Sequence, residues 1–199
     1  MAEMIRFQAF LYAAALLLLT QHQATRADEL TISGSTAGVV TGVPELSFTG
    51  NNFTGTTALG IGSLSGLNSL GSFFLSTGGL ASVSGSFTLN VTFTAPTIIS
   101  GGQGTTYSAT ITGTVSPNID QGGVFIDFNP APATQNFTFA NAVTSGSFSL
   151  TVPDLFVQSG RSAPLTAGFT GEQTAIPEPS SLVLIGVGIA GLAAALRRR

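Results

Sequence analysis

The stretch Phe87-Thr88-Leu89-Asn90-Val91-Thr92-Phe93-Thr94, residues 87–94, decides the fold class. Apolar side chains at every second position alternate with threonine and asparagine. This period of two predicts a β-strand with one buried face and one face in water. Residues 107–115 and 147–152 repeat the pattern. Three such segments in one chain predict an antiparallel sheet, because antiparallel sheets are commonly buried on one face only.

Shorter candidate strands surround these three segments, and clusters of Gly, Asn, Ser and Pro separate them. The candidates are Leu30–Ser33, Leu46–Thr49, Phe73–Leu75, Val124–Phe128, Phe137–Phe139 and Leu165–Phe169. We interpret the Gly- and Ser-rich segment Gly55–Gly85 as irregular strands, with a long mobile loop as the alternative. No segment between Asp28 and Ile176 has a helical period. We therefore expect an all-β fold, an antiparallel β-sandwich or jelly roll, with phenylalanines filling the core.

The N-terminal segment has the order of a secretory signal peptide. Arg6 supplies a positive charge, residues 7–19 are apolar, and Thr25-Arg26-Ala27 offers small residues at the cleavage site. We expect residues 1–27 to be removed before Asp28.

The C-terminal segment combines three signals. Pro177-Glu178-Pro179 is an extended, helix-disfavouring hinge. The uncharged run Leu182–Leu196 is expected to cross the membrane as a helix, and Arg197-Arg198-Arg199 to anchor it on the cytoplasmic side. Gly186, Ala190 and Ala194 recur every four residues, so they form a small-residue face on which another helix could pack.

This C-terminal order resembles the PEP-CTERM sorting signal of Gram-negative bacteria, whose motif matches Pro177, Glu178 and Pro179. The resemblance implies recognition by an exosortase, a membrane-embedded cysteine transpeptidase-like enzyme. It also implies transient anchoring in the inner membrane, a final place at the cell surface or outside the cell, and an association with exopolysaccharide and biofilm matrix. The expected organisation is a signal peptide at residues 1–27, a β-sandwich body at residues 28–175 and a sorting segment at residues 176–199.

The composition of the body excludes several function classes. One base, Arg161, stands against seven acids between Asp28 and Ile176, which leaves a formal charge of −6. Nucleic acid would be repelled, so we expect no nucleic-acid partner. The chain has no cysteine and no lysine, and its one histidine, His22, lies in the expected signal peptide. Thiolate metal sites are excluded, and groups for acid–base catalysis are scarce.

We therefore expect a non-enzymatic surface or matrix protein with a structural or adhesive role and no required cofactor. One alternative is a carbohydrate-binding module, although Tyr107 falls on the core face of its strand. A second is a glycoside hydrolase using a carboxylate pair drawn from Asp120, Asp127 and Asp154. The favoured role for Asp120 is to form a turn. Asp127 shares a face with Phe125, where it faces solvent on an edge strand or holds a turn or a cation. Asp120 and Asp127 are also loose candidates for a calcium site, with Glu45 and Asp154 as further oxygen ligands.

Overall fold

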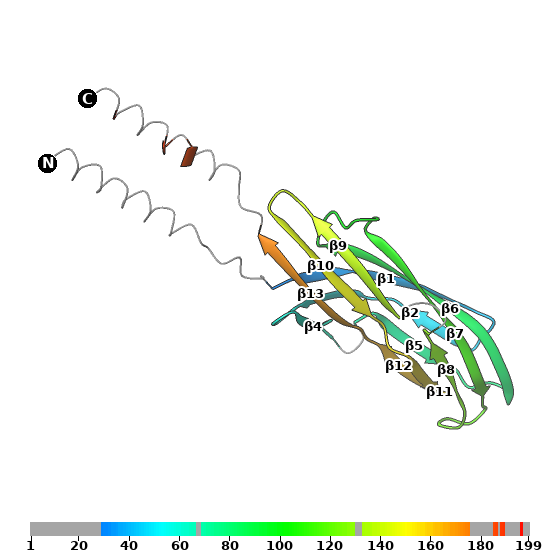
Figure 1. Cartoon of the computed structure of the whole chain (residues 1–199). Coiled ribbons are helices and arrows are strands. Elements are labelled where there is room, and N and C mark those ends of the chain that lie inside the picture. The colour runs from blue at the N-terminus through cyan, green and yellow to red at the C-terminus, as the bar shows by residue number, and fades with distance from the viewer. Residues whose placement is uncertain are drawn as a thin grey trace.

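The computed structural model describes residues 29–66, 69–129 and 133–175, together with residues 185, 186, 188, 189 and 196. The prediction of an all-β body is confirmed (Figure 1). Within the described ranges the strands are β1 (Thr31–Thr41), β2 (Leu46–Thr49), β3 (Asn52–Thr56), β4 (Ile61–Ser63), β5 (Gly71–Leu75), β6 (Ala81–Ala95), β7 (Gly104–Val115), β8 (Gly123–Asp127), β9 (Thr134–Ala140), β10 (Thr144–Thr151), β11 (Leu155–Gln158), β12 (Arg161–Leu165) and β13 (Gly168–Ala175).

The strands form three antiparallel sheets. A six-stranded sheet has the order β11-β8-β7-β6-β1-β3, a four-stranded sheet the order β4-β13-β10-β9, and a three-stranded sheet the order β12-β5-β2. The long hairpin β6–β7 lies in the middle of the six-stranded sheet, with registered pairs from Ala81↔Val115 to Thr92↔Gly104. Figure 1 shows these two strands running side by side along the body.

One half of β6 packs against the three-stranded sheet through aromatic rings. The ring of Phe87, fully buried, lies 4.7 Å from the ring of Phe73 on β5 and 4.9 Å from that of Phe48 on β2, measured between centroids. The rings meet at steep interplanar angles of 69° and 59°. The contact with Phe73 is edge-to-face and the contact with Phe48 is tilted. Edge-to-face contacts stabilise a core beyond simple burial of area.

The other half of β6 packs against the four-stranded sheet. The ring of Phe93 lies 5.0 Å from the ring of Phe137 on β9 and 5.3 Å from that of Phe148 on β10. A single strand of the large sheet therefore contacts both smaller sheets. The alternation at residues 87–94 creates this arrangement, because it places Phe87 and Phe93 on the same inward face.

Most of the predicted strands are confirmed, and one is wrong. The three alternating segments lie in β6, β7 and β10, and Leu46–Thr49 is β2. The segment Leu165–Phe169 is not one strand, because β12 ends at Leu165 and β13 begins at Gly168. The burial alternation continues through it, since Leu165, Ala167 and Phe169 are all buried. The pairing partner changes, however, from β5 before the break to β10 after it.

The interpretation of Gly55–Gly85 as irregular strands is confirmed by β4, by β5 and by the first part of β6. The predicted signal peptide lies outside the described residues, and so does most of the predicted sorting segment. Where the structure does describe the chain, it contains no helix with the length and apolar character needed to cross a membrane.

Candidate binding site on the four-stranded sheet

The residues of the predicted sorting segment lie almost entirely outside the described part of the chain. This holds for Pro177, Glu178 and Pro179, for Ala190 and Ala194, and for the three terminal arginines. Gly186 is described and is exposed. The proposed small-residue face therefore stays a prediction.

The structure places Asp120 in a turn, as the sequence favoured. Its backbone has a φ of 62°, a left-handed conformation that aspartate tolerates better than most residues. Both carboxylate oxygens accept hydrogen bonds from Arg161, from Nε and from Nη2, each at 2.7 Å. The hydrogen bonds from Arg161 lower the pKa of Asp120 below its ordinary value. This bidentate pair between residues 41 positions apart was not foreseen from the sequence.

Asp127 and Asp154 together hold the turn that follows β8. Asp127 Oδ1 accepts a hydrogen bond from the Asn129 backbone N–H at 2.8 Å. The Asp154 carboxylate accepts one from the Phe128 N–H at 2.8 Å and one from Asn129 Nδ2 at 3.2 Å. The predicted role of Asp127 in a turn is thus confirmed, and it shares the outward face with Phe125. The edge-strand alternative is wrong, because β11 pairs with β8 on its outer side.

The acidic residues do not gather into a metal centre in the described ranges. No group of three or more Asp, Glu, His or Cys side chains lies close enough there to hold an ion. A calcium ion at Asp120 would also have to displace the Arg161 guanidinium from both oxygens. Calcium at Asp120 or Asp127 remains an untested prediction.

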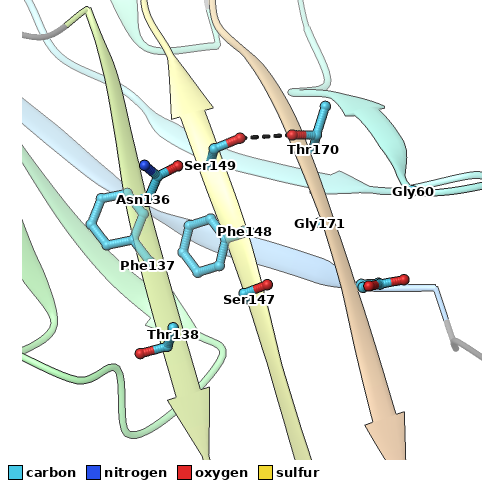
Figure 2. A pocket seen from close by; sticks show the side chains of 10 residues that line it. Gly60, Asn136, Phe137, Thr138, Ser147, Phe148, Ser149, Thr170 and Gly171 are labelled. Carbon is cyan, nitrogen blue, oxygen red and sulfur yellow. Dashed lines mark hydrogen bonds between the residues drawn. The ribbon is translucent and has the colours of Figure 1, made fainter.

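The structure has a hollow of about 480 Å³ on the outer face of the four-stranded sheet. Figure 2 shows its side chains on three neighbouring strands, β9, β10 and β13. We call it the trough and define it by its six polar residues: Asn136, Thr138, Ser147, Ser149, Thr170 and Glu172. Its volume lies within the roughly 300–1,000 Å³ that is typical of small-ligand sites.

Strand register creates the trough. In one row across the strands Ser149 pairs with Asn136 on one side and with Thr170 on the other. In the next outward-facing row Ser147 lies between Thr138 and Glu172. The small serines of the central strand form a low floor, and the longer side chains of the flanking strands form two walls.

The inward face below the trough is tightly packed. The rings of Phe137 and Phe148 stack there, with centroids 4.7 Å apart and an interplanar angle of 21°. Gly171 pairs with Phe148, and a Cβ at this glycine would lie 2.5 Å from the Phe148 Cβ. The Gly171 N–H also donates a hydrogen bond to the Gly60 carbonyl at 2.9 Å, which ties the β3–β4 turn to the rim of the trough. The floor is therefore held by packing from below.

The sequence carried only part of the signal for the trough. The alternation at residues 147–152 already marked Ser147 and Ser149 as one polar face. Neither periodicity nor spacing could show that β13, starting at residue 168, pairs with β10 and brings Glu172 beside Ser147. The trough is a product of pairing between segments, so the residues of its walls were missed.

A second exposed feature lies on the six-stranded sheet. Phe125 on β8 and Phe156 on β11 are cross-strand partners, and their side chains are 42% and 53% exposed. Phe74, on the three-stranded sheet, is also exposed. The expectation that phenylalanines fill the core is therefore confirmed for most of them but not for these three.

Comparison with known proteins identifies a sorting motif at the C-terminal end of the chain. Residues 175–199 match the PEP-CTERM protein-sorting motif. No curated protein and no solved structure matches the chain. The motif indicates an exported protein that is anchored transiently in the membrane before processing. More particularly, the motif is the substrate signal of exosortase, a membrane protease, so the chain carries an exosortase recognition signal at its C-terminal end.

Proposed function

We propose that this protein is a structural or adhesive component of the cell surface or extracellular matrix, in an exopolysaccharide or biofilm context. The observation that carries the proposal is the sorting motif, which begins at residue 175, where β13 ends. The folded body thus runs directly into the segment that exosortase recognises. Cleavage there would release the body with its core complete.

The surface of the body supports this role. Its outward strand faces are dominated by hydroxyl side chains, as in the cross-strand row formed by Thr41, Ser86 and Thr110. Hydroxyls donate and accept hydrogen bonds without charge, which suits contact with hydrated polymers. We also propose that the three sheets make the two layers of a β-sandwich. The packing of β6 against both smaller sheets supports this description.

Two alternatives remain from the sequence. The trough favours a carbohydrate-binding module, which is compatible with an adhesive role. A glycoside hydrolase has less support, because catalysis by this route uses two carboxylates across the bond. Glu172 is the one carboxylate among the residues that line the trough. We propose no enzymatic activity.

The test is the fate of the chain in a host that contains an exosortase. Mass spectrometry of medium, outer surface and inner-membrane fractions would define both ends of the mature protein. We expect a body without the sorting segment outside the cell, and accumulation of the membrane-bound precursor when Pro177 and Pro179 are both changed to alanine. Ser180→Ala and Ser181→Ala serve as matched controls. Full-length protein soluble in the cytoplasm would refute the proposal.

A further inference from the structure

We infer that the trough is a binding site for an uncharged polysaccharide chain, in which Glu172 accepts hydrogen bonds from adjacent sugar hydroxyls. This inference deepens the proposed function. It rests on that function only because a place at the cell surface or in the matrix brings the protein into contact with polysaccharide.

Part of the trough has unused hydrogen-bonding capacity. On the outer face of this sheet, the hydroxyls of Thr134 and Thr151 pair with each other at 2.8 Å, and those of Ser149 and Thr170 at 2.7 Å. These four hydroxyls pair within the protein. The next row, Thr138–Ser147–Glu172, has no side-chain hydrogen bond in the structure, and neither has Asn136.

The open row Thr138–Ser147–Glu172 carries donors and acceptors that match those of a sugar. A hydroxyl or amide both donates and accepts, whereas an ionised carboxylate only accepts. A sugar presents neighbouring hydroxyls that do both, so two of them can donate to the two oxygens of Glu172. Hydrogen bonds to an ionised acceptor are short and roughly twice as strong as neutral ones. By strand register Thr138 and Asn136 lie across the serine floor from Glu172 and Thr170, and they can bond the opposite edge of the sugar.

The charge of the trough favours an uncharged ligand. The residues that line the trough contain one carboxylate and no cationic side chain. The single base of the body, Arg161, is held by Asp120. A glycan that carries carboxylate, sulfate or phosphate groups would be repelled by Glu172 and by the net negative body. An uncharged glycan has no such penalty.

The fold preorganises the trough. All six residues of the trough lie on paired strands and not on loops, and stacked rings pack beneath the floor. A site held in this way loses little conformational freedom when a ligand binds. The trough lies on the outer face of the sheet and not inside the protein, so a segment of a polymer can bind there without being enclosed.

The test uses full-length protein purified in a mild detergent and a set of immobilised glycans: dextran, amylose and cello-oligosaccharides as neutral probes, and alginate as an anionic one. We expect binding to at least one neutral probe and none to alginate. Glu172→Gln keeps the shape but removes the ionised acceptor, so it should weaken binding about tenfold or more. Thr138→Val should weaken it as well.

The matched control is Glu29→Gln, which removes the same charge from an exposed position outside the trough. We expect it to bind as the unchanged protein does, and equal thermal unfolding temperatures would show that all variants are folded. The inference is overturned if no neutral probe binds, if alginate binds instead, or if Glu172→Gln binds normally. Loss of binding in Phe125→Ala, together with normal binding in Glu172→Gln, would place the binding site on the six-stranded sheet and would overturn the inference too. Failure here leaves exosortase processing untouched, so the two proposals fail separately.

Discussion

Replacing Phe87 by alanine should remove a cluster of ring contacts between the six-stranded sheet and the three-stranded one. The side chain is fully buried, and its ring meets those of Phe73 and Phe48 with centroids less than 5 Å apart. Truncation of such a ring costs about 3–5 kcal/mol, which combines lost burial with the cavity that remains. Single domains have about 5–15 kcal/mol of total stability, so a large share would be lost. The midpoint of thermal unfolding should fall by about 10 °C or more.

The measurement is urea unfolding of a recombinant body spanning residues 29–175, followed by far-ultraviolet circular dichroism. Phe74→Ala is the matched control, because it deletes the same atoms from the residue next to Phe73 on β5. The side chain of Phe74 is 45% exposed. We expect the control to lose less than about 1 kcal/mol. Equal losses in the two variants would refute the reasoning, since they would mean that Phe87 does not lie at the interface between the sheets.

Three further predictions concern single groups. Leu59 is fully exposed with a φ of 54° in the turn before Gly60, so Leu59→Asn, which suits this conformation, should raise the free energy of unfolding by about 0.5–1 kcal/mol; a decrease would contradict the assigned turn. Burial raises the pKa of Tyr107, whose hydroxyl donates to the Leu150 carbonyl at 2.9 Å. The folded state therefore holds this proton more tightly than the unfolded state, and the free energy of unfolding should fall as the pH rises above about 10. Tyr107→Phe should lower the free energy of unfolding by about 1 kcal/mol at neutral pH and should show little of the decline at alkaline pH. Unfolding measured at several pH values checks both results. Because the pKa of Asp120 is lowered, the ion pair with Arg161 stabilises the folded state at neutral pH, and this stabilisation is lost as the pH falls through the folded-state pKa. Arg161→Gln should therefore have a lower free energy of unfolding than the unchanged protein at neutral pH but an equal one in strong acid, as measured by unfolding at both pH values.

Periodicity was sufficient to predict the fold class and the central strands. The alternation at residues 87–94 marked β6, and that at residues 107–115 marked β7. In β1 the sequence predicted only the first residues, yet the strand extends to Thr41. Gly34 and Gly38 break its apolar pattern for a reason that only packing reveals. A Cβ at Gly38 would lie 2.5 Å from the Phe87 ring, so the strand lacks a side chain there to make room for an aromatic neighbour.

The trough and the Asp120–Arg161 pair were less accessible to sequence reasoning, for one common reason. Each depends on which segments become neighbours, and neighbours are chosen by the complete set of strand pairings. Glu172 gave no signal, because its segment is rich in Thr, Gly and Gln and has little apolar alternation. Turn assignments for Asp120 and Asp127 succeeded because the determinants of a turn are local.

The start of β1 and the end of β13 lie beside each other, since Gln173 Nε2 donates a hydrogen bond to the Glu29 carbonyl at 3.1 Å. A short flexible peptide between residues 175 and 29 would therefore close the backbone into a ring with little entropic cost. New ends could then be opened in an exposed turn such as the one at Leu59–Gly60, giving a circular permutant with the same sheets. The order in which the strands are synthesised is thus separable from the way they pair.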